Sequence, residues 1–72
     1  MSKIQPLINK IETYPTQKII DVLWAMNKKW NEFTVEERMV RLALFTVYED
    51  RLGEDAIDQL MESLLEAVGE LY

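Results

Sequence analysis

The sequence predicts an all-α protein, a compact helical bundle of three long helices and a shorter N-terminal one. Four stretches carry apolar residues at helical spacing, the connections between them are short, and no β-hairpin signal occurs. At 72 residues the chain is near the lower limit at which one core is stable. We therefore expect a single helical domain over residues 1–72, completed by dimerisation.

The central helix is expected over residues 34–53. Thr34 and Glu37 have the spacing of a capping box, in which hydroxyl and carboxylate each accept a hydrogen bond from a backbone amide. Gly53 provides the stop, because glycine readily adopts the left-handed conformation that ends a helix. Between these signals the apolar residues point in nearly every direction: Met39, Val40, Leu42, Ala43, Leu44, Phe45, Val47 and Tyr48. Such a helix is normally buried on all sides, so we expect the others to pack around it.

The two preceding helices are expected over residues 4–14 and from Thr16 to about Asn31. The apolar stripe of the first follows the i, i+3, i+4, i+7 rule, with Pro15 closing it: Ile4, Leu7, Ile8, Ile11 and Tyr14. The second has a packing seam and a second stripe beside it: Ile19, Leu23, Met26 and Trp30, then Ile20 and Trp24. Residues 31–34 form a tight connection, which predicts that the second and third helices are antiparallel neighbours.

The fourth helix is expected to open at Asp55 and to continue to the end of the chain, with one apolar half and one polar half. Four carboxylates recur every four residues on the polar half: Asp58, Glu62, Glu66 and Glu70. Like charges at this spacing cost roughly a few tenths of a kcal/mol per pair. This acidic ladder is therefore either a solubilising face or a docking surface for a basic partner.

The charge balance excludes some classes of partner. The net charge is −5, and it divides into +2 for residues 1–33 and −7 for residues 34–72. An acidic balance argues against direct binding of nucleic acid, which needs clustered Lys and Arg, and against an anionic membrane surface. The longest apolar run, Val22–Met26, is far too short to span a bilayer, and the first ten residues do not resemble a secretory signal. We expect a soluble cytoplasmic protein.

The residue types also argue against catalysis. The chain has neither cysteine nor histidine, so disulfides, thiolate–zinc sites and the usual proton shuttle are excluded. No Gly-rich phosphate loop occurs, and no histidine is present to activate a serine. The acids around Gly53 do not follow the EF-hand pattern and are interpreted as helix caps. We expect no enzyme activity, no cofactor, no metal and no small-molecule substrate.

These features favour a protein–protein interaction module, either a homodimer or an accessory subunit of a larger complex. Its candidate apolar docking residues are Ile20, Trp24, Trp30, Arg41, Phe45 and Tyr48. Trp24 and Trp30 point about 120° apart, so one is expected in the core, and the other either covers its edge or anchors a partner. Trp24 is the candidate anchor. Arg41, inside an apolar band, is interpreted either as a snorkelling, locally paired residue or as half of an interface ion pair.

The alternative hypothesis uses the acidic ladder instead. In it the chain is an acidic inhibitor or adaptor, such as a phage-type host-factor blocker or a mimic of a nucleic-acid backbone. The two hypotheses differ in which face matters: apolar substitutions should abolish the first activity, and charge reversals on the ladder the second.

Overall fold

The computed structural model describes residues 3–70, and this part of the chain contains helices and no strand. The α-helices are α1 (Gln5–Ile11), α2 (Thr16–Ala25), α3 (Val35–Leu52) and α4 (Glu54–Ala67), with a 3-10 turn, η1 (Trp30–Glu32), between α2 and α3. The described residues fit within 35 × 26 × 19 Å. The predicted all-α fold class is confirmed.

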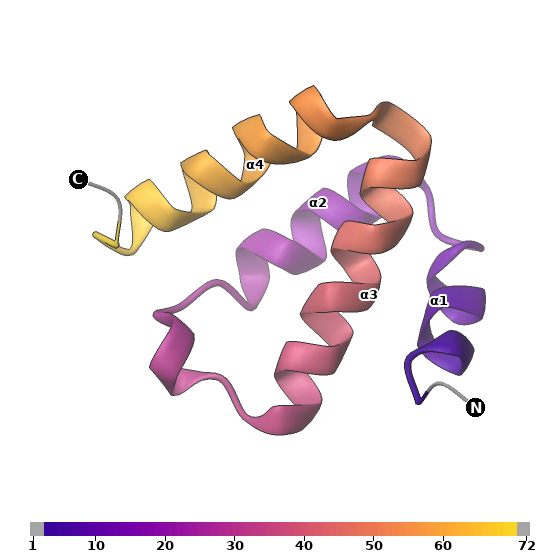
Figure 1. The fold of residues 1–72 in the computed structure, drawn as a ribbon, viewed down its shortest axis with the longest axis horizontal. Helices are drawn as coiled ribbons and strands as arrows, with labels where there is room; N and C mark the ends of the chain where they lie inside the picture. Colours follow the sequence, from indigo (N-terminus) through magenta and orange to yellow (C-terminus); the bar gives the residue numbers. More distant parts are fainter. Residues whose placement is uncertain (1–2, 71–72) are drawn as a thin grey trace.

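The longest helix, α3, is the central element, as the sequence predicted. It contacts α1, α2 and α4, and Figure 1 shows it between α1 on one side and α2 behind, with α4 crossing near its C-terminal end. Every α-helix contributes to the buried apolar cluster, and α3 contributes half of it, more than any other helix: Ile11, Ile19, Leu23, Ala43, Leu44, Phe45, Val47, Tyr48, Ile57 and Leu64. The core therefore lies along α3.

Both predicted ends of α3 are confirmed. The Thr34 hydroxyl accepts a hydrogen bond from the Glu37 amide at 3.1 Å, and the Thr34 amide donates to the Glu37 carboxylate at 2.9 Å. Gly53, with φ +91°, ends α3 and directly precedes α4. Since a left-handed φ is strained for any residue with a Cβ, glycine allows this one-residue corner.

The second helix is shorter than predicted. It ends at Ala25, not near Asn31, so α2 and α3 are joined by residues 26–34 and not by four residues alone. Just beyond this end, the Asn27 side chain makes a distant contact and donates to the Leu64 carbonyl at 2.9 Å. That carbonyl lies in the last turn of α4, where backbone oxygens lack a helical partner. In Figure 1, α2 and α3 still run in broadly opposite directions.

The fourth helix also ends earlier than predicted. Gly69 has φ +77°, its amide donates to the Glu66 carbonyl at 3.1 Å, and the Glu70 amide donates to the Leu65 carbonyl at 2.9 Å. This is the Schellman arrangement, which closes a helix through a left-handed glycine. Gly69 was the sequence signal for the stop. The predicted continuation through Leu71 and Tyr72 lies outside the described residues.

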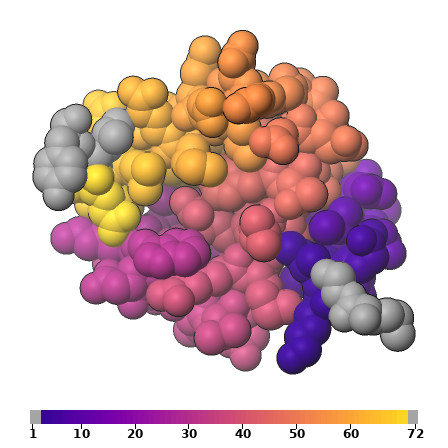
Figure 2. Space-filling model, in the orientation of Figure 1, coloured from indigo at the N-terminus to yellow at the C-terminus, as the bar shows by residue number. Residues whose placement is uncertain are grey.

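The prediction that α3 is buried on all sides is wrong. Its neighbours α1, α2 and α4 cover only part of its circumference, and they leave Val35 68% and Leu42 58% exposed. Figure 2 shows α3 reaching the surface in the middle of this face, below α4 and beside α1. Within residues 3–70, none of the helices combines the length and the apolar character needed to cross a bilayer.

Candidate protein-docking groove

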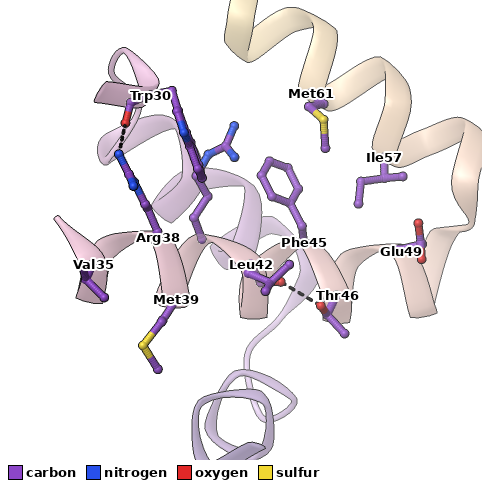
Figure 3. Close-up of a pocket in the computed structure, with 11 residues that line it drawn as sticks. Trp30, Val35, Arg38, Met39, Leu42, Phe45, Thr46, Glu49, Ile57 and Met61 are labelled. Carbon is purple, nitrogen blue, oxygen red and sulfur yellow. Dashed lines mark hydrogen bonds between the residues drawn. The ribbon is translucent and has the colours of Figure 1, made fainter. Parts of the chain in front are cut away.

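A groove of about 560 Å³ follows the exposed side of α3, between η1 at one end and the first turns of α4 at the other. We call it the α3–α4 groove, and Figure 3 shows its residues. It is lined by Trp30, Val35, Arg38, Met39, Arg41, Leu42, Phe45, Thr46, Glu49, Ile57 and Met61.

The body of the groove is apolar, and helical spacing produces it. Val35, Met39, Leu42 and Thr46 follow one another at steps of four, three and four along α3, which places them on one stripe. Beside the stripe, the buried Phe45 ring points towards Met61 of α4 (Figure 3). The groove is thus bounded by rigid helices, and its most accessible apolar side chains are on α3.

Arginine and aromatic side chains form one end of the groove. The Arg38 guanidinium lies over the Trp30 ring at 4.6 Å, and the Arg41 guanidinium lies over the Phe45 ring at 4.7 Å and the Trp30 ring at 5.6 Å. Cations are attracted to ring faces in this geometry. Burial lowers the pKa of Arg41 from its usual range, and the nearby Glu70 carboxylate opposes this shift. The Arg41 guanidinium is thus packed among aromatic rings at this end of the groove.

Trp30 is half exposed but held in place from two sides. Its amide donates to the Glu70 carboxylate at 3.0 Å, and its carbonyl accepts from Arg38 Nη2 at 3.2 Å (Figure 3). Its ring also contacts Phe33, with centroids 6.0 Å apart. A large aromatic side chain fixed at the rim of an apolar groove loses little entropy when a partner covers it.

The other end of the groove carries the opposite charge. Glu49 is exposed, and Figure 3 shows it at the far end of α3 from Trp30 and Arg38. The Arg38 guanidinium uses one donor on the Trp30 carbonyl, while its Nε is buried without a hydrogen-bond partner. The α3–α4 groove is therefore an apolar strip with a positive end and a negative end.

The structure brings together half of the apolar residues that the sequence proposed. Trp30, Arg41 and Phe45 line the groove. Tyr48 is buried in the core and Ile20 is partly buried against it, so neither lines the groove, and their contact with a partner stays a prediction. The reason is that α3 turns Tyr48 inward, away from the stripe that solvent reaches.

The prediction that one tryptophan is core and the other exposed is also wrong. Trp24 is 42% and Trp30 49% exposed. Because α2 ends at Ala25, the two rings no longer share a helix, and the assumed angle between them does not apply. Trp24, the expected anchor, lies outside the groove lining, whereas Trp30 belongs to it. Arg41 makes no ion pair within residues 3–70, so the structure leaves both interpretations of this residue open.

The acidic ladder is shorter than predicted. Asp58, Glu62 and Glu66 are exposed on α4, but Glu70 lies beyond the helix and binds the Trp30 amide. In the described part of the chain the one ion pair is between Lys28 and Glu37, at 2.8 Å. The three ladder acids on α4 therefore face solvent without a cationic partner.

Sequence reasoning proposed Arg41 and Phe45 on α3 but missed the other six α3 residues that line the groove: Val35, Arg38, Met39, Leu42, Thr46 and Glu49. Their stripe was visible in the spacing, but a helix apolar on every side gives no indication of which side its neighbours leave open. The polar residues Thr46 and Glu49 were the available signal, since they follow Leu42 at helical spacing on that same side.

A metal site finds no support in the described residues. Over residues 3–70, no group of three or more Asp, Glu, His or Cys side chains lies close enough to hold a metal ion. The helices place the protein in the all-α class. Comparison with protein-family models, curated proteins and solved structures finds no match to this chain.

Proposed function

We propose that the chain is a small protein-interaction module that docks an amphipathic helix in the α3–α4 groove. The observation that carries the proposal is the exposed apolar stripe of α3, with Leu42 58% exposed at its middle. Monomeric proteins rarely leave contiguous apolar surface in water, and such surface normally marks a contact site.

The dimensions favour a helix as the occupant. The stripe from Val35 to Thr46 covers twelve residues of α3, and its ends are about 16 Å apart at 1.5 Å per residue. A partner helix of three turns covers that length and can present apolar anchors at i, i+3, i+4 and i+7. Trp30 and Arg41 add an aromatic and an arginine side chain, the types that contribute most to protein interfaces.

The test is site-specific photo-crosslinking in the cells that make the protein. A photoreactive residue at Thr46, which is exposed in the groove, should give protein adducts, and one at Gln59, exposed on α4 outside it, should not. Leu42→Lys should abolish the Thr46 adducts. Leu52→Lys is the matched control, because Leu52 is also on α3 and 50% exposed but does not line the groove.

Two results would overturn the proposal. Adducts at Thr46 that survive Leu42→Lys would mean that the groove is not their cause. Adducts at Gln59 that disappear with Glu62→Lys and Glu66→Lys would move the docking surface to the acidic ladder and favour the inhibitor or adaptor hypothesis.

A further inference from the structure

The charge pattern of the groove points to a particular occupant. We infer that the groove receives α3 of a second copy of this chain, in a two-fold dimer whose α3 helices pack antiparallel, with Arg38 of each copy facing Glu49 of the other. This inference rests on the proposed function, because it uses the same groove.

The first argument is that α3 is both the floor of the groove and a helix of the kind the groove fits. Val35, Met39 and Leu42 are at the spacing of the anchors that a helix inserts into an apolar groove. A two-fold axis places the same patch on both partners, so a self-docking surface must be complementary to itself. An exposed apolar stripe along one helix meets that condition.

The second argument is the position of the charges. Arg38 and Glu49 lie at opposite ends of the stripe, eleven residues and therefore about 16 Å apart along α3. An antiparallel two-fold between the two α3 helices, with its axis midway between these positions, sets the positive end of each copy against the negative end of the other. A parallel arrangement would place arginine against arginine, so the charges select the antiparallel one.

The side chains have donors and acceptors free for this pairing. A guanidinium has five N–H donors, and Arg38 uses one of them, on the Trp30 carbonyl. The Glu49 carboxylate is exposed, and it takes no part in the Lys28–Glu37 ion pair, the only one within residues 3–70. Each Arg38–Glu49 contact would be at the rim of the interface, while Leu42 of both copies lies near the axis.

The experiment is a charge swap read by sedimentation equilibrium on the purified full chain. The wild type should reach twice 8.5 kDa at micromolar concentration. Arg38→Glu or Glu49→Arg alone should weaken the dimer by about tenfold or more, because each single variant turns both rim pairs into like charges. An equimolar mixture of the two single variants should dimerise again, since it restores opposite charges at both ends.

The mixing step distinguishes a second copy from any other partner. Recovery in the mixture also shows that both variants fold, which circular dichroism checks separately because Arg38 supports Trp30. If Arg38→Glu disturbs the helices, a comparison of Leu42→Lys with Leu52→Lys tests the same interface. The dimer should be lost in Leu42→Lys and kept in Leu52→Lys.

The possible failures separate this inference from the proposed function. A wild type that stays at 8.5 kDa at high micromolar concentration, with groove-dependent adducts to a different protein, ends the second-copy inference and leaves the interaction module. A dimer that is unaffected by the charge swap and by Leu42→Lys contradicts the inference, because its interface lies elsewhere. Loss of the groove-dependent adducts together with a monomeric wild type contradicts both.

Discussion

Glu37 makes two interactions at the start of α3. Because of them, the stability of the fold depends on whether the Glu37 carboxylate is ionised. Its carboxylate accepts from Lys28 at 2.8 Å and from the Thr34 amide at 2.9 Å. The hydrogen bond from Lys28 is the main cause that holds the Glu37 pKa below its usual 4.5, and the bond from Thr34 acts in the same direction. A lowered folded-state pKa stabilises the fold above the unfolded-state value, and the contribution is lost as pH falls through the folded-state value.

We therefore predict that Glu37→Gln reduces stability at pH 7 and also reduces the loss of stability on acidification below about pH 4.5. Urea unfolding at a series of pH values measures both effects. Glu36→Gln is the control, because Glu36 is also in the first turn but takes no part in the capping box or the Lys28 ion pair. An identical pH dependence for the two variants would contradict the prediction.

Arg51 is a second residue with a structural role. Its hydrogen bonds are to residues that lie far from it in the sequence. Its guanidinium donates to the Tyr14 carbonyl at 2.7 Å, the Glu12 carbonyl at 2.9 Å and the Thr16 hydroxyl at 3.2 Å. It therefore ties the connection between α1 and α2 to the end of α3.

We predict that Arg51→Met destabilises the fold by about 2 kcal/mol, because carbonyl groups lose a charged donor that satisfied them. Arg51→Lys should recover only part of this, since a single ammonium cannot reproduce the planar set of donors. Urea unfolding gives the free energies, and hydrogen exchange should rise first over residues 12–16. Full recovery by lysine would show that charge alone matters at this position.

At the scale of the element, α4 offers a test of how much the acidic ladder contributes. Asp58, Glu62 and Glu66 are exposed on this helix and have no cationic partner within residues 3–70. We predict that Glu62→Lys with Glu66→Lys leaves stability unchanged within about 0.5 kcal/mol. The lysine at position 62 gains an i, i+4 pair with Asp58, and the lysine at 66 lies at the helix C-terminus, where a cation is favourable.

Thermal unfolding by circular dichroism measures this double variant, with Glu62→Gln and Glu66→Gln as the neutral control. A loss well above 0.5 kcal/mol in the lysine variant alone would mean that these acids make contacts beyond those of an exposed face. Glu70 gives the lysine at 66 no i, i+4 partner on the helix, because α4 ends at Ala67.

The elements also show why part of the structure was predictable. The capping box at Thr34 and the stop at Gly53 depend on residues within one turn, so local chemistry was enough to place both ends of α3. Just after the end of α2, Asn27 donates to the carbonyl of Leu64, 37 residues away, and no local pattern reveals such a contact.

The groove was only partly predictable from the sequence. The types of Trp30, Arg41 and Phe45 suggested an interface, and all three line it. Which side of α3 stays open was set by where α1, α2 and α4 pack, and that turned Tyr48 inward and Leu42 outward. Residue type therefore predicted candidates, while the choice among them required the tertiary arrangement.

At the scale of the whole molecule, association and stability should be coupled. A chain of 72 residues has a small core, and this one leaves Val35, Leu42 and Trp30 accessible along one groove. If a second copy covers that groove, the dimer contributes to stability by mass action, so the melting temperature depends on protein concentration.

We predict that Tm rises by roughly 5–10 °C over a hundredfold increase in concentration above the dimer Kd. A hundredfold change corresponds to about 2.7 kcal/mol per dimer and half of that per chain, and about 1 kcal/mol per chain shifts Tm by about 4–8 °C in a domain of this size. Circular dichroism at several concentrations and path lengths measures the shift, with a single cooperative transition expected throughout. Leu42→Lys should melt at one temperature regardless of concentration, whereas Leu52→Lys should keep the wild-type dependence, because only Leu42 lines the groove. A wild-type Tm that is constant over the range would mean that the exposed stripe of α3 is not covered by a second copy.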